Sequence, residues 1–233
     1  WVSDTTLELE LRQDVKFHDG AVFNADDAKF SLERAMAQSS NYGVYTQGIE
    51  RIVKINDYTI DILTKGPNPV LQRQLTELRM MDQGWAEKNK SVEPKDIKTK
   101  DENFAHRNAN GTGPFMLKSW EPDVKLVLVR NPAWWGRMAG NLTEIVYTPI
   151  KSEATRVAAL LSGEVDMVLD PSPADLVKLR STANLKVVDG AENRTIFFGM
   201  DQFRDELPGS NVKGRNPLKD VRVRKALYQA IDV

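Results

Sequence analysis

Residues 145–169 read IVYTPI-KSEATRVAALLSG-EVDMVL and carry the strongest architectural signal in the chain. The apolar run at residues 145–150 favours a strand, and residues 165–169 repeat that pattern after Gly163, a typical helix stop. Between them, apolar residues recur at helical spacing: Ala154, Val157, Ala158 and Leu161. The segment predicts a strand–helix–strand (βαβ) unit, so the expected fold class is α/β (mixed α+β).

Before this unit, the sequence alternates between strand and helix signals. Leu7, Leu9 and Leu11 alternate with charged residues, as in a strand with one buried face. Asn24 precedes a helical apolar pattern, and Asp27 three residues later completes a capping-box pattern. Residues 49–55 and 58–63 predict a hairpin because Asn56-Asp57 suits a two-residue turn. Helical spacing then returns in three leucines: Leu71, Leu75 and Leu78.

Residues 87–110 are polar, which predicts a surface connection with a domain boundary near residues 103–111. A second hairpin is expected at residues 115–120 and 125–130, around a Glu-Pro-Asp turn. Ser172 is a candidate helix cap before Pro173 and Asp175. Strands are expected at residues 185–188 and 195–200. A last helix is expected from apolar residues on one face: Val223, Ala226, Leu227, Ala230 and Ile231.

Composition narrows the possible functions. The chain has 233 residues, 41% hydrophobic and 28% charged, which is enough apolar material for globular domains. Its 32 basic residues nearly balance 33 acidic ones, so no nucleic-acid partner is expected. It has no cysteine and no apolar run of about 18 residues that would predict a membrane span. Because it opens at Trp1 and stops inside a predicted helix, we expect a fragment of a longer protein.

An ordered series of motifs along nearly the whole chain resembles a known family. The motifs are VKFHDG at 15–20, NADDA at 24–28, FSLER at 30–34, GTGPF at 111–115, SWEP at 119–122, RNPAWWG at 130–136, LLSGEVD at 160–166, VRVRKAL at 221–227 and AID at 230–232. Each motif alone is weak, but their order and spacing together are specific. They resemble the extracellular solute-binding proteins of family 5, the peptide- and nickel-binding receptors of ABC importers.

The resemblance implies a partial periplasmic-binding-protein-like fold. Residues 1–105 would form a small extra α/β domain, residues 106–193 part of the first ligand-binding lobe, and residues 194–233 a truncated start of the second lobe. It implies capture of an oligopeptide-like or dipeptide-like solute and its delivery to an ABC permease, in the periplasm or on the extracellular face, with a lipid anchor as one option. The oligomeric state is open, with a dimer through the truncated surface as one option.

The first predicted ligand segment is Leu169-Asp170-Pro171-Ser172. It follows an expected strand, and ligands in open α/β sheets lie beyond the carboxyl ends of strands. Helix-start N–H groups at Ser172 would receive a ligand carboxylate, and Asp170 would meet an amine. The alternative is that this segment forms only a turn and a helix cap.

The second predicted segment is Phe197-Phe198-Gly199, where family members place aromatic and polar pocket residues on a strand. Aromatic faces would pack on peptide side chains while strand backbone groups pair with the peptide main chain. The alternative is an ordinary buried strand. Gly199 stands where some relatives have an acidic ligand contact, so that charged contact is absent here.

The remaining candidates favour structure over chemistry. Trp134 and Trp135 read as a corner that buries large rings. His18 and His106 are the only histidines, and without cysteine they give little support for a metal site, so we expect no metal and no cofactor. Hydrolase, zinc-protease, phosphate-loop and dinucleotide motifs are missing from the sequence, so we expect no enzyme. The alternative function is a peptide-sensing or chaperone-like interaction module. A peptide hydrolase is a further, less favoured alternative.

Overall fold

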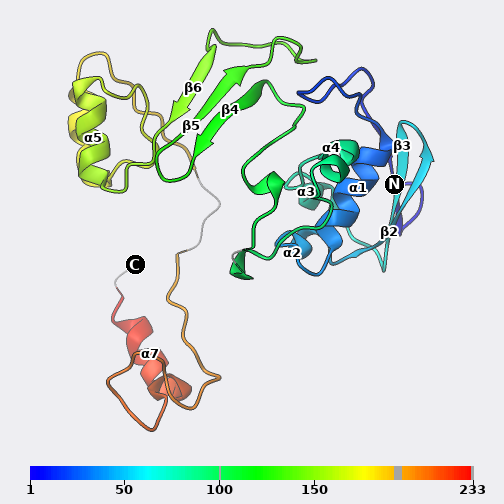
Figure 1. The fold of residues 1–233 in the computed structure, drawn as a ribbon. Coiled ribbons are helices and arrows are strands. Elements are labelled where there is room, and N and C mark those ends of the chain that lie inside the picture. The colour runs from blue at the N-terminus through cyan, green and yellow to red at the C-terminus, as the bar shows by residue number, and fades with distance from the viewer. Residues whose placement is uncertain (100, 192–195, 232–233) are drawn as a thin grey trace. The chain divides into compact units, whose positions relative to one another are not determined.

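The computed structural model describes residues 1–99, 101–191 and 196–231 (Figure 1). The chain divides into two compact units, Trp1–Met167 and Val168–Val233. The boundary expected near residues 103–111 therefore lies inside the first unit, and the division into a small domain and two lobes stays a prediction.

The first unit begins with an antiparallel three-stranded sheet of order β1-β3-β2. Its strands are β1 (Thr6–Glu10), β2 (Ile49–Asn56) and β3 (Thr59–Thr64). Leu7 and Ile52 both lie opposite Ile62, and all three side chains are at most 4% exposed. Because side chains alternate across a strand, this row forms the buried face of the sheet. The predicted first strand and hairpin are confirmed.

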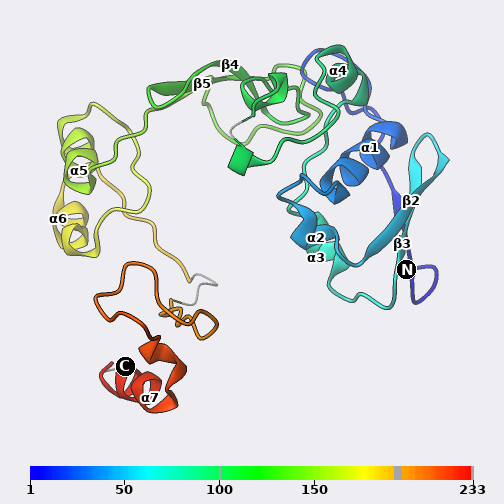
Figure 2. The same cartoon turned by 60° about the horizontal axis from the view of Figure 1, so that its bottom comes forward.

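Helix α1 (Ala25–Met36) packs against this sheet with α2 (Gly43–Thr46), α3 (Leu71–Leu75) and α4 (Gln83–Lys88) nearby (Figures 1 and 2). Asn24 caps α1, and the predicted capping box is present, with Asp27 accepting from the backbone N–H of Asn24. Ala28, Leu32 and Leu71 are buried in the same core as the sheet face. The expected helices at Asn24 and at Leu71 are both confirmed, although α3 spans only five residues.

The polar stretch at residues 87–110 is fastened to this core. It contains the end of α4 and two 3₁₀ turns, Ile97–Thr99 and Phe104–His106. Ser91 is 0% exposed, the Ser39 hydroxyl donates to Pro94 O at 2.7 Å, and Arg34 Nε donates to Val92 O at 3.0 Å. The low apolar content of residues 87–110 predicted only a surface connection. It did not indicate that side chain-to-backbone hydrogen bonds anchor this segment to the core.

The rest of the first unit holds a second antiparallel sheet of order β4-β5-β6, followed by a helix. The strands are β4 (Phe115–Glu121), β5 (Lys125–Arg130) and β6 (Glu144–Tyr147), and the helix is α5 (Glu153–Ser162). The Ser152 side chain caps α5, and Gly163 ends it with φ +78°, where glycine avoids steric strain. The second hairpin, the helix and its glycine stop are confirmed.

The predicted βαβ unit is wrong. Strand β6 pairs antiparallel with β5, and residues 165–169 form no strand. Met167 is 73% exposed and Leu169 is 62% exposed. A strand needs a neighbour to take its backbone hydrogen bonds, and none of the described strands pairs with these residues. The apolar residues at 165–169 favour a strand, but the chain supplies no neighbouring strand for them in the described ranges.

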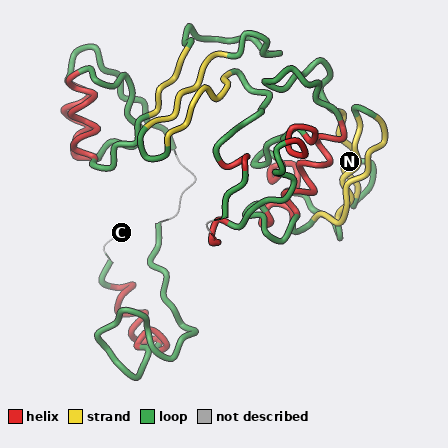
Figure 3. Tube along the Cα trace, in the orientation of Figure 1, coloured by secondary structure: helices red, strands yellow, loops and turns green. Residues whose placement is uncertain are grey.

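The strands expected at residues 185–188 and 195–200 fail for the same reason. Figure 3 draws no strand after β6 in the described part of the chain. Val188 is 81% exposed and Ile196 is 89% exposed, so neither lies on a buried sheet face. Residue 195 lies outside the described residues.

The second unit is built from short helices and turns. They are the 3₁₀ turn Pro173–Asp175, α6 (Leu176–Ser181), the 3₁₀ turn Pro217–Lys219 and α7 (Val221–Gln229). Buried Asn216 organises its C-terminal part, because its amide donates to Asp201 O and Arg204 O while its side-chain oxygen accepts from Leu218 N. The predicted last helix is confirmed, with Asp220 as its cap.

Candidate functional site

The first predicted ligand segment forms an exposed turn. Asp170 adopts φ +49°, a left-handed conformation that Asp tolerates better than most residues. Leu169 is 62% exposed, whereas Pro171 and Ser172 are half-buried. Ser172 O accepts from Asp175 N at 2.9 Å, but the Ser172 side chain makes no cap hydrogen bond. The turn is present and the predicted side-chain cap is not, while contact with a ligand stays a prediction.

The second predicted segment, residues 197–199, is exposed to solvent and forms no strand. Phe197 and Phe198 are each 78% exposed, and Gly199 is exposed as well. The expectation of a buried strand is therefore wrong for residues 196–200. Both predicted segments belong to the second unit, and no hydrogen bond between them is found in the described ranges.

Trp134 and Trp135 form a corner, as expected. Trp134 is half-buried, whereas Trp135 is exposed. Their ring centroids lie 5.4 Å apart, and Trp134 rests on Gly136, where an added Cβ would come within 2.6 Å of the indole. Trp135 is 44% exposed and lies under the Arg12 guanidinium at 4.4 Å. Core packing is therefore wrong for Trp135, because a cation covers its face instead of apolar side chains.

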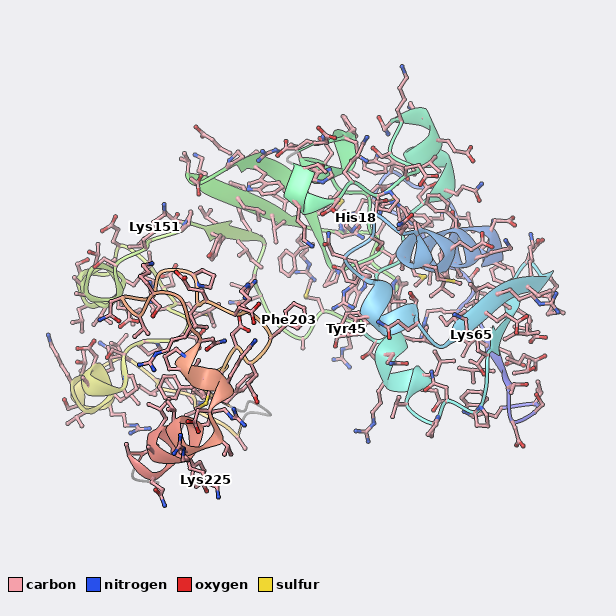
Figure 4. The ribbon with its side chains drawn as sticks, turned by 90° about the horizontal axis from the view of Figure 1, so that it is seen from below. His18, Tyr45, Lys65, Lys151, Phe203 and Lys225 are labelled. Atoms are coloured by element: carbon pink, nitrogen blue, oxygen red, sulfur yellow. The ribbon has the colours of Figure 1, made fainter. Side chains whose placement is uncertain are left out.

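The best-defined polar arrangement of the first unit surrounds His18, which lies in the turn after β1 (labelled in Figure 4). Its ring Nδ1 lies 3.2 Å from Gly111 N, and its Nε2 lies 3.1 Å from Gly113 O. His18 N also donates to Gly111 O at 2.8 Å. His18 is structural, as predicted, but its partners 93 and 95 residues away could not be read from sequence spacing.

A second set of contacts lies beside His18. Asn110 is 7% exposed; its side-chain oxygen accepts from Asp19 N at 3.1 Å, and its amide donates to Asp82 Oδ2 at 3.1 Å. These residues and the β4–β5 hairpin surround a hollow of about 310 Å³, lined by His18, Asp19, Trp85, Ala109, Asn110, Met116, Leu117, Lys118 and Val129. Its polar side chains already have protein partners at Asn110 and His18, which favours a structural joint over a ligand pocket.

Buried charge in this unit is also used for structure. Burial raises the pKa of Asp27, although the backbone N–H groups of Gln83 and Asn24 favour its charged form. Burial likewise lowers the pKa of Arg34, whose guanidinium donates to Val92 O. In the ranges that the structure describes, no group of three or more His, Cys, Asp or Glu side chains has a metal-site arrangement.

The family is settled by comparison with family models. The model of the bacterial extracellular solute-binding proteins, family 5 middle region, matches residues 1–233. The chain belongs to this family. The resemblance inferred from the motifs is therefore confirmed.

Curated relatives match along nearly the whole chain. The periplasmic oligopeptide-binding protein OppA of Escherichia coli is 27% identical over 96% of this chain and 41% of its own length. The dipeptide-binding protein of the same organism is 24% identical over 97% of this chain and 43% of its own length. The chain thus spans about two fifths of the length of these relatives.

Solved structures place the fold among periplasmic binding proteins. DppA from Helicobacter pylori, in complex with peptide STSA, has a TM-score of 0.64 at 27% identity, covering 78% of this chain and 38% of that one. NikZ from Campylobacter jejuni, in complex with Ni(L-His), has a TM-score of 0.67 at 22% identity, covering 78% and 35%. The expected partial periplasmic-binding-protein-like α/β fold is confirmed.

Among the described helices, none combines the length and the apolar character that crossing a membrane requires.

Proposed function

We propose that the protein containing this chain captures an oligopeptide-like or dipeptide-like solute outside the cytoplasmic membrane and delivers it to an ABC-type permease. The observation that carries this proposal is the match of a solute-binding family model to all 233 residues. The peptide class is supported by relatives named for oligopeptide and dipeptide binding at 24–27% identity. The proposed periplasmic or extracellular location is supported by the same names and by the family's description.

Capture of this kind requires a concave site between lobes and no catalytic group. We therefore propose a binding protein with no enzymatic step and no cofactor. In the proposed organisation, residues 1–105 form the small domain, residues 106–193 part of the first lobe and residues 194–233 the start of the second lobe.

The proposed ligand contacts come from residues 169–172 and from the aromatic segment 197–199. Phe197 and Phe198 present large apolar faces to solvent, which suits packing against peptide side chains. The turn at Asp170 exposes a carboxylate that suits a peptide amine. At the exposed turn Pro173–Asp175, Pro173 has no N–H and Asp175 N donates to Ser172 O, so the proposed donors to a peptide carboxylate are the backbone N–H groups of Ser172 and Ala174.

Calorimetry with a set of di- to pentapeptides tests the proposal on the protein at its full length. We expect binding, and we expect Phe197→Ala and Phe198→Ala each to weaken Kd by roughly tenfold, the usual loss for an aromatic anchor. Phe203→Ala is the matched control, because Phe203 is 93% exposed in the same unit and outside the proposed site (Figure 4).

If Phe197→Ala, Phe198→Ala and Phe203→Ala have equal Kd values, residues 197–199 are not part of the binding site. Peptide cleavage in place of binding would replace the transport proposal with hydrolysis. The isolated 233-residue chain is expected to bind weakly or not at all, because it spans about two fifths of the length of its curated relatives and the proposed capture needs two complete lobes. Micromolar or tighter binding by this chain alone would contradict that expectation.

A further inference from the structure

His18 connects two parts of the first unit that are far apart in sequence. Its backbone follows β1 in the layer built on the first sheet, whereas Gly111 and Gly113 lead directly into β4 of the second sheet. Three hydrogen bonds join His18 to this loop: the ring accepts from Gly111 N and bonds to Gly113 O, and the His18 backbone N–H donates to Gly111 O. No other side chain in the described ranges bonds to both Gly111 and Gly113.

The partners fix the protonation pattern of the ring. A backbone carbonyl only accepts, so Nε2, which faces Gly113 O at 3.1 Å, must carry the proton. A backbone N–H only donates, so Nδ1, which faces Gly111 N at 3.2 Å, must be the unprotonated acceptor. The ring is therefore the neutral Nε2–H tautomer, as inferred from its bonding network.

The loop that His18 holds is tied from the other side as well. Asn131, just after β5, donates its amide to Gly113 O at 3.1 Å and its backbone N–H to Pro114 O at 2.8 Å. Trp135 Nε1 donates to Thr112 O at 3.0 Å. Gly113 O thus receives two donors from two parts of the chain, which uses both of its lone pairs.

One edge of the His18 ring lies beside the backbone of Gly111. A Cβ at Gly111 would lie 3.4 Å from His18 Cε1, in direct contact with the ring. The neighbouring Asn110 accepts from Asp19 N and donates to Asp82 Oδ2, so the backbone directly after His18 is also held.

We propose that His18 is a positioning residue. In its Nε2–H tautomer it locks the Gly111–Gly113 loop and so fixes the second sheet to the layer of the first sheet. The role requires both an acceptor and a donor at opposite ends of one flat ring, a combination that imidazole supplies and no aliphatic side chain can.

Two measurements on the 233-residue chain test this role. The first is nitrogen-15 NMR of the histidine rings, which distinguishes protonated from unprotonated ring nitrogens. We expect the His18 proton on Nε2 with Nδ1 unprotonated. A proton on Nδ1 overturns the proposal, because Gly111 N–H would then face a second donor.

The second measurement is hydrogen–deuterium exchange at the Gly111 amide, read by NMR. Loss of its acceptor in His18→Ala should speed exchange by roughly tenfold, as expected for losing a hydrogen bond and its supporting contact. His18→Asn places its amide oxygen near the position of Nδ1, where it can accept from Gly111 N, and should restore protection. His18→Gln places its amide near the position of Nε2, where its N–H can donate to Gly113 O but no acceptor reaches Gly111 N, and should not restore it.

His106→Ala is the control, since its ring bonds only to Asn103 three residues away. We expect this variant to leave Gly111 exchange unchanged. If His18→Asn and His18→Gln exchange at the same rate, a tautomer-specific role is refuted. If His18→Ala fails to fold, the comparison of the Asn and Gln variants still decides the outcome.

Discussion

Asp27 is the residue whose removal should reveal most about how the first unit is held together. Its two carboxylate oxygens accept from two different segments: Oδ2 from Asn24 N at 3.0 Å and Oδ1 from Gln83 N at 2.9 Å. One side chain thus closes the start of α1 and fastens the start of α4. Asp27→Ala removes both bonds from a site that is 7% exposed.

The expected cost is about 2 kcal/mol in the free energy of unfolding. Two hydrogen bonds to a carboxylate contribute about 1.5 kcal/mol each, and part of this gain offsets the cost of burying the group. The assay is urea unfolding followed by far-ultraviolet circular dichroism. Asp26→Ala is the control in the same helix turn, and because its ion pair with Lys54 is exposed to solvent, its loss should cost much less. Equal losses in the two variants would refute the reasoning.

The same residue predicts a pH dependence with a definite sign. Burial raises the pKa of Asp27 above 3.8, so the folded state binds the proton more tightly than the unfolded state. As pH falls through the raised pKa toward 3.8, the native chain should therefore gain stability relative to Asp27→Asn. If the free energy of unfolding of the native chain relative to Asp27→Asn stays constant or falls over this pH range, the raised pKa of Asp27 is contradicted.

Three further predictions concern the core, the tryptophan corner and the last helix. Ile62→Ala should cost about 3 kcal/mol in urea unfolding, because Ile62 is 0% exposed and its loss leaves a cavity. Gly136→Ala should cost about 1–3 kcal/mol, because its Cβ would meet the Trp134 indole at 2.6 Å. Arg222 lowers the pKa of Asp220 to about 2, so the capping contribution of Asp220 to α7 should be present above about pH 3.8 and lost as pH falls toward 2. Chemical shifts of the α7 amides would follow this last change.

Each of these has a control within the chain. Ile55→Ala removes an isoleucine that is 52% exposed on the same sheet, and it should cost less than about 1 kcal/mol. Gly140→Ala meets no atom within 4 Å and should be tolerated. Asp220→Asn should abolish the acid-dependent change in α7, and an unchanged transition in that variant would exclude Asp220 as its source.

The sequence predicted local elements well where their hydrogen bonds are local or join adjacent strands. The capping box at Asn24, both hairpins, α5 with its Gly163 stop and α7 all depend on residues close in the chain. Strand predictions failed at residues 165–169, 185–188 and 196–200, because a strand exists only where a second strand accepts its backbone hydrogen bonds. Apolar composition does not indicate whether such a neighbouring strand exists.

The candidate site divides in the same way. The Asp170 turn was open to prediction from its residue types, since Asp tolerates positive φ. The His18 contacts with Gly111 and Gly113 were not, because they join residues more than 90 positions apart. The motifs that contain these residues identified the family without indicating that they touch.

We propose that this chain belongs to a receptor that captures a peptide-like solute. The most direct measurement is mass spectrometry of small molecules released on denaturing the full-length protein purified from its native host, with the 233-residue chain treated alongside. A peptide or similar solute released only by the full-length protein is the predicted result. Release of nothing by either, together with turnover of a peptide library by the full-length protein, would contradict it.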